Sequence, residues 1–91
     1  MPITLDHTIV CASNPQASAE FITDVLGLPP ATVLGHFTVV RIGESSLDFV
    51  ADDSVITSRH FAFRVDEKRF DEIMARVEDR ALALVVSVNV V

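Results

Sequence analysis

The stretch NPQASAEFITDVLGL, residues 14–28, carries a complete helix signal, and the rest of the fold is organised around it. Asn14 is a good N-cap residue, and Pro15 suits the first helical position because no N–H is needed there. Apolar residues then recur at helical spacing, at Ala17, Phe21, Ile22, Val25 and Leu26. Gly27 is placed to end the helix, and Pro29-Pro30 prevents its continuation. The stretch therefore predicts a helix over Pro15–Leu26.

Strand patterns lie on both sides of this helix. Ile3–Cys11 alternates between two faces with the period of two that is typical of a strand. Gly35–Gly43 is rich in Phe and β-branched residues, and Gly43-Glu44-Ser45 suits a hairpin turn into a third strand, Ser46–Ala51. A weaker signal for a short strand lies at Thr32–Leu34. This part of the chain is expected to run strand, helix, strand, strand.

The pattern then restarts about fifty residues later. His60–Val65 is expected to be a strand, and Asp66 can cap a second helix over Glu67–Asp79, whose apolar stripe is Phe70, Ile73, Met74 and Val77. Leu82–Val91 is a β-branched run without a charged residue. We therefore expect a single α+β domain over residues 1–91, with a first module at about 1–56 and a partial second module at about 57–91. Both helices are expected to pack on one face of an antiparallel-rich sheet.

Composition excludes several classes of function. The chain has 91 residues, 49% of them hydrophobic, which suffices for one small folded domain. Seven Lys and Arg stand against thirteen Asp and Glu, giving a net charge of −6, so a nucleic-acid or anionic-membrane partner is not expected. The single Cys11 excludes an internal disulfide and a cysteine zinc cluster. With no secretory signal pattern at the start, we expect a cytoplasmic protein.

Three residues could carry metal chemistry: His7, Asp48 and His60. His7 and His60 occupy equivalent places near the start of the first strand in each half. Two imidazoles and a carboxylate can bind Zn²⁺, Fe²⁺, Mn²⁺, Ni²⁺ or Co²⁺ and leave positions open for a substrate. The alternatives are ordinary: a histidine on an apolar strand face is more often packed than a ligand, and Asp48 could be a solvated strand residue. His36, beside Gly35, is expected to be exposed.

Four phrases of the sequence, in their order and spacing, resemble one superfamily. They are LDHTIV at 5–10, ASAEFITDVLGL at 17–28, LDFVADD at 47–53 and HFAFRVDE at 60–67. Together they resemble the vicinal oxygen chelate superfamily, which includes glyoxalases, bleomycin resistance proteins and extradiol dioxygenases. The resemblance covers roughly residues 3–80.

The resemblance implies two βαβββ modules around a cleft, with metal ligands on the first and last strands of each module. Carried over, His7 and His60 are the first-strand ligands, and Asp48 is at or near the place where the family often has Glu. His7 and His60 should then lie close together on neighbouring strands. The chain ends at Val91 without the last strands of a second module. We expect a short or truncated member, with the fourth ligand from a second chain or from water.

The resemblance also implies a function, a metal-dependent lyase, isomerase or dioxygenase acting on a small molecule chelated through its oxygens. One alternative is a metal-free protein that binds a small molecule, as antibiotic-sequestering members do. Another is an inactive truncated member. We also expect a homodimer with Leu82–Val91 at or near the interface, because this apolar run would otherwise form an aggregation-prone edge.

Overall fold

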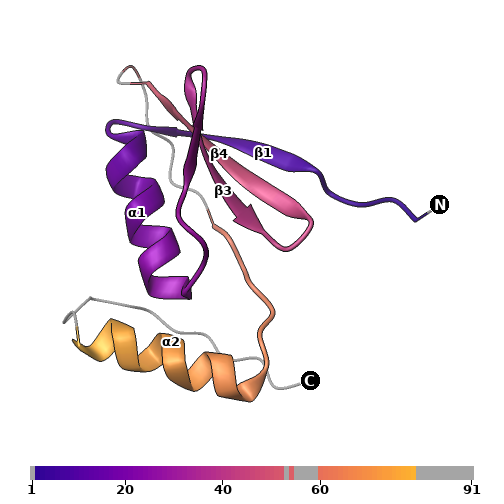
Figure 1. The fold of residues 1–91 in the computed structure, drawn as a ribbon, viewed down its shortest axis with the longest axis vertical. Helices are drawn as coiled ribbons and strands as arrows, with labels where there is room; N and C mark the ends of the chain where they lie inside the picture. Colours follow the sequence, from indigo (N-terminus) through magenta and orange to yellow (C-terminus); the bar gives the residue numbers. More distant parts are fainter. Residues whose placement is uncertain (1, 53, 55–59, 80–91) are drawn as a thin grey trace.

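A computed structural model describes residues 2–52, 54 and 60–79 (Figure 1). In chain order the described elements are β1 (His7–Ala12), α1 (Pro15–Leu26), β2 (Thr32–Leu34), β3 (Phe37–Ile42), β4 (Ser45–Ala51) and α2 (Glu67–Asp79). The fold is α+β, as the sequence predicts. The short strand at Thr32–Leu34, the weakest of the sequence signals, is present.

The four described strands form one mixed sheet in the order β1-β4-β3-β2. β2 is antiparallel to β3 and β3 is antiparallel to β4, and tight turns at Gly35-His36 and Gly43-Glu44 join them. Gly35 and Gly43 hold φ at 58° and 59°, a left-handed conformation that glycine adopts without steric cost. β1 instead runs parallel to β4, at the edge of the described sheet. α1 follows β1 in the chain and gives it the crossover that a parallel strand needs.

The core lies between α1 and one face of the sheet. Strand residues whose side chains point to this covered face are buried, among them Val10, Val40, Leu47 and Phe49. Val40, on β3, is completely inaccessible, as is Ala19 on the facing side of α1. Strand neighbours of these residues must point the other way, because side chains alternate along a strand. We call this second side the open face, since neither described helix packs against the strands there.

Both helices begin as the sequence predicts. The side chain of Asn14 accepts a hydrogen bond from the backbone N–H of Ala17, 3.1 Å away, which satisfies one free donor of the first turn of α1. Asp66 does the same for α2 by accepting from the N–H of Arg69 at 2.8 Å. Gly27 ends α1 with φ of 68°. These local capping contacts explain why the predicted helix boundaries are confirmed.

Two predicted strands differ from the structure. β1 begins at His7 and not at Ile3, because its one partner in the described sheet, β4, begins at Ser45. The carbonyl of Asp6 still accepts from the N–H of Ser46 at 2.9 Å, and no described strand pairs with the residues before it. In Figure 1 the N-terminal segment extends away from the sheet. His60–Val65, expected to be a strand, has no regular secondary structure. A strand needs hydrogen bonds from a neighbouring strand, and no described strand pairs with this segment.

The packing of α2 is also different from the prediction. α2 lies against α1 and makes no contact with a described strand, so only α1 covers the sheet. Val77 is the buried residue of α2, and the guanidinium of Arg76 donates to the backbone oxygen of Val25 at 3.1 Å. The reason is that α1 already covers the buried face, across β1, β4 and β3. The run Leu82–Val91 lies outside the described residues.

Within the described part of the chain, no helix is long and apolar enough to cross a membrane.

Gly27 allows a first test of this packing. A Cβ at Gly27 would lie 2.9 Å from Nη1 of Arg76, whereas one at Gly43 would meet nothing within 4 Å. Both positions have positive φ, so alanine costs about 1 kcal/mol at either one. At Gly27 it should also displace Arg76 from Val25, adding about 1 kcal/mol for the lost hydrogen bond.

We therefore expect urea denaturation to show a larger loss of stability for Gly27→Ala than for Gly43→Ala. Equal losses in the two variants would show that the Arg76 contact does not hold the helices together.

Candidate metal site

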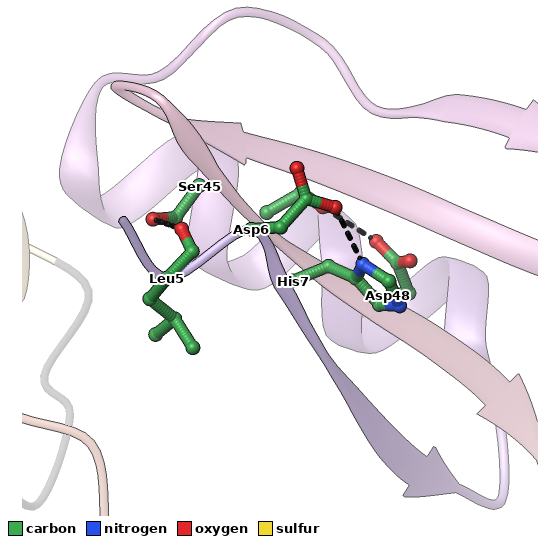
Figure 2. Close-up of polar contacts among 6 residues, drawn as sticks. Leu5, Asp6, His7, Ser45 and Asp48 are labelled. Carbon is green, nitrogen blue, oxygen red and sulfur yellow. Dashed lines mark hydrogen bonds and ion pairs between the residues drawn. The ribbon is translucent and has the colours of Figure 1, made fainter. Parts of the chain in front are cut away.

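The open face brings His7 and Asp48 together on adjacent strands. In the parallel register His7 is opposite Ser46 and Ile9 is opposite Asp48, so the imidazole and the carboxylate are diagonal neighbours. Their neighbours Thr8 and Leu47 pair on the covered face. Figure 2 shows the side chain of Asp48 beside that of His7, with the carboxylate of Asp6 at the Nδ1 atom of the ring. Two of the three predicted ligands therefore share one face.

The ring of His7 is held in one tautomer by its neighbour. Nδ1 of His7 lies 2.7 Å from Oδ2 of Asp6 (Figure 2). An ionised carboxylate can only accept, so Nδ1 carries the proton and donates it. Nε2 is then the ring nitrogen with a free lone pair, and the side chain of His7 is half exposed. This pattern, in which a carboxylate holds the other ring nitrogen, is the usual support for a metal-binding histidine.

Asp48 is positioned by its own strand. The hydroxyl of Ser46, two residues earlier on the same face, donates to Oδ1 of Asp48 at 2.8 Å. Ser46 is buried and Asp48 half-buried, so this hydrogen bond fixes the direction of the carboxylate. Oδ1 retains a second lone pair, and Oδ2 receives no hydrogen bond from the described residues. The carboxylate can therefore still bind a cation.

The pKa of His7 is raised above its ordinary value. The larger cause is the hydrogen bond to Asp6, and the second is the negative charge of Asp48 across the strand pair. Both carboxylates favour the imidazolium form. The same negative potential that attracts a proton to His7 would also attract a divalent cation.

His60 stands apart from the pair. It is exposed and lies in the segment without secondary structure, so the predicted arrangement of His7 and His60 on neighbouring strands is wrong. No group of three His, Cys, Asp or Glu side chains in residues 2–52, 54 and 60–79 is close enough to hold a metal ion. The role of His60 as a third ligand stays a prediction. His36 is exposed in the β2–β3 turn, as expected.

Sequence reasoning missed the two residues that orient the candidate ligands, Asp6 and Ser46. Asp6 precedes His7 directly, and Ser46 is two residues before Asp48, a spacing that puts both side chains on one face of a strand. The period of two could therefore have found Ser46. No sequence pattern shows that the side chain of Asp6 turns back to its neighbour's ring.

A separate apolar groove lies on the other side of the sheet, beside α1. It has a volume of about 420 Å³ and is lined by Ala17, Ser18, Phe21, Ile22, Leu47, Phe49 and Phe61. Leu47 and Phe49 belong to the covered face, so this groove does not include His7 or Asp48. The chain thus offers a polar pair and an apolar groove on opposite faces.

Several proteins of known structure have a fold similar to that of this chain. The structure resembles that of Oxidase ChaP-H1, with a TM-score of 0.85 and 40% sequence identity over 89% of this chain and 66% of that one. It also resembles a possible glyoxalase from Bacillus cereus, with a TM-score of 0.66 and 21% identity over 87% of this chain and 75% of the other. For lactoylglutathione lyase from Agrobacterium tumefaciens the TM-score is 0.61 and the identity 22%, over 91% and 74% of the two chains. No protein-family model and no curated protein matches the sequence.

The chain has a glyoxalase-like fold, and its structural neighbours agree with the resemblance of its sequence to the vicinal oxygen chelate superfamily. It spans just under two thirds of the length of the oxidase that it resembles at 40% identity.

The contact between Asp6 and His7 generates a pH prediction. In the protein without added metal, NMR titration should give His7 a pKa above the ordinary histidine value, and Asp6→Asn should lower it by removing the largest cause. A raised folded-state pKa stabilises the fold below the unfolded-state pKa, and this stabilisation is lost as the pH rises through the folded-state pKa.

The matched control is Asp71→Asn, which makes the same change of charge on α2, away from the sheet. If the two variants leave the pKa of His7 equally high, the hydrogen bond from Asp6 is not its cause.

Proposed function

We propose that this protein is a metal-dependent enzyme, a lyase, isomerase or dioxygenase, acting on a small molecule that binds through neighbouring oxygens. The observation that carries the proposal is the pair on the open face. His7 has Nδ1 bound to Asp6 and Nε2 free, and the carboxylate of Asp48 lies on the adjacent strand. The resemblance of the chain to an oxidase at 40% identity supports an oxidative reaction among these alternatives.

His7 and Asp48 could supply two of the ligands that a divalent cation needs. One neutral imidazole and one carboxylate are two ligands of the arrangement that uses two histidines and a carboxylate. We propose His60 as the third ligand and leave the identity of the ion open among Zn²⁺, Fe²⁺, Mn²⁺, Ni²⁺ and Co²⁺. When bound, such an ion supplies Lewis-acid polarisation of substrate oxygens and, in the case of iron, activation of dioxygen.

The protein's own residues would orient the reacting groups. Asp6 keeps the proton of His7 on Nδ1, so Nε2 faces a ligand as a lone pair. Ser46 holds one oxygen of Asp48, which restricts the rotation of the carboxylate. Ile9 is 45% exposed on the same face, opposite Asp48 and two residues after His7, and its side chain would exclude water from one side of a bound substrate.

The apolar groove favours a second candidate function, the binding of a hydrophobic small molecule without metal. Phe21 is 48% exposed and Phe61 38%, and both line the groove. Apolar pockets with aromatic walls are the usual sites for such ligands. This site is independent of His7 and Asp48, so the two functions can be separated by variants.

We propose that the protein works in the cytoplasm as a homodimer. Within the described residues β1 is an edge strand, and Ile3, Leu5 and Ile9 on or before it are exposed. A second copy that covers this edge would bury these side chains and could supply a further ligand to the site.

Metal binding is the direct test of the proposed function. Elemental analysis of the protein purified without added metal, followed by Zn²⁺ titration in a calorimeter, should show one ion per chain or per shared site. His7→Ala should weaken binding by more than the roughly 10–100-fold expected for loss of an outer partner such as Asp6. Asp48→Asn and His60→Ala should each weaken it as well.

His36→Ala is the matched control, since His36 is an exposed histidine in the β2–β3 turn. Binding should also weaken at acid pH, because a ligand imidazole must be neutral. Unchanged Zn²⁺ affinity in His7→Ala would refute the metal site. Unchanged affinity in His60→Ala alone would remove only the third ligand.

Sedimentation equilibrium tests the dimer. We expect a mass of two chains at micromolar concentration and dissociation by Val88→Lys, which places a charge in the run Leu82–Val91. The control is Asp71→Lys on α2, which adds a positive charge at a residue that is already exposed. A monomer mass for the unaltered chain contradicts the proposal.

A further inference from the structure

Arg41 stands in one row with the candidate ligand His7. Ser46 on β4 is opposite His7 on one side and opposite Arg41 of β3 on the other. Residues opposite each other on neighbouring strands share a face, so all three belong to the open face. The alternation along β3 agrees, because Val40, next to Arg41, is completely buried on the covered face. Two strand spacings separate His7 from Arg41, roughly 10 Å between their backbones.

The guanidinium of Arg41 has no hydrogen bond or ion pair within residues 2–52, 54 and 60–79, and Arg41 is exposed. Asp48, which is diagonal to Arg41 across β3 and β4, receives the hydroxyl of Ser46. Arg41 is therefore held by its strand beside the site while its donors stay available.

Among the described strands, β2 pairs only with Phe37–Val39, so at Arg41 strand β3 has a neighbour on one side, β4. Arg41 is therefore placed both to protect this local edge and to face a ligand on the open face. Covering the open face with an apolar partner would bury the guanidinium without a counter-charge, which costs free energy. The position instead suits a ligand that brings its own negative charge.

We propose that Arg41 binds a carboxylate or similar oxyanion on the substrate, and so selects anionic chelators over neutral ones. This rests on the proposed function, since the neighbouring oxygens of the same molecule would bind at His7 and Asp48. The planar guanidinium gives two parallel hydrogen bonds to a carboxylate, which lysine cannot reproduce. The substrate class is therefore a small molecule with two neighbouring oxygens at one end and an anionic group at the other.

The test uses two probes that differ by one carboxylate, 3,4-dihydroxybenzoate and catechol. The ¹⁵N-labelled full chain is titrated with each probe by NMR, once without metal and once with Zn²⁺. We expect 3,4-dihydroxybenzoate to shift the signals of Arg41 and Ser46 in both states and to bind more tightly than catechol. Arg41→Gln should reduce this preference about tenfold in the Zn²⁺-loaded protein, while Arg41→Lys retains part of it.

The matched control is Arg69→Gln, which removes one positive charge from α2, a helix that does not contact the sheet. Arg69→Gln should keep the preference, and Arg41→Gln should bind Zn²⁺ with unaltered affinity. An equal preference in Arg41→Gln and the unaltered chain overturns the assignment, as does the absence of any shift at Arg41 in both states. If Zn²⁺ does not bind but the metal-free chain prefers the carboxylated probe, the anion site stands and the metal proposal fails.

Discussion

The packing of α1 on one face of the sheet is the constraint on which the rest of the structure depends. Val40 and Ala19 are inaccessible to solvent, and Val10, Leu47 and Phe49 surround them. Burying these side chains fixes which residues of each strand point toward α1. A shift of one residue in register would turn the buried side chains to the opposite face of the sheet. The same choice turns His7, Asp48 and Arg41 toward the open face. The candidate site is thus positioned by apolar residues that never contact a ligand.

Much of the fold follows from local signals. The boundaries of α1 and α2 are set by Asn14, Gly27 and Asp66, whose capping contacts involve residues at most a few positions away. Local sequence patterns predicted tertiary contacts less well than they predicted helix boundaries. His60–Val65 has the alternation of a strand but no partner in the described sheet, and α2 packs on α1 because the covered face is already occupied. Alternation predicts which residues of a strand would share a face. It does not show whether another strand is available to pair with it.

The candidate site also combines features that the sequence predicts with features that it does not. His7 and Asp48 were recognisable by residue type and by resemblance, and the period of two along their strands predicts which residues share their faces. Their diagonal proximity depends on the parallel register between β1 and β4, which no short pattern contains. The contact from Asp6 to the ring of His7 was also out of reach, since adjacent strand residues ordinarily point to opposite faces. Asp6 lies before β1 begins, where that rule no longer applies.

The parallel pairing of β1 with β4 also has a consequence for the order in which the chain folds. β2, β3 and β4 are joined by tight turns and can pair within short loops, whereas Leu5 reaches Ser45 across 40 residues of sequence. Closing a long loop costs more entropy than closing a hairpin, so we expect the docking of β1 to follow formation of the β2–β3–β4 meander. Pulse-labelled hydrogen exchange would show this as later protection of Ile9 than of Val40, and simultaneous protection would contradict it. Because His7 is on β1 and Asp48 on β4, the two halves of the candidate metal site would meet only in this last step. A cation present during folding could then favour completion of the sheet.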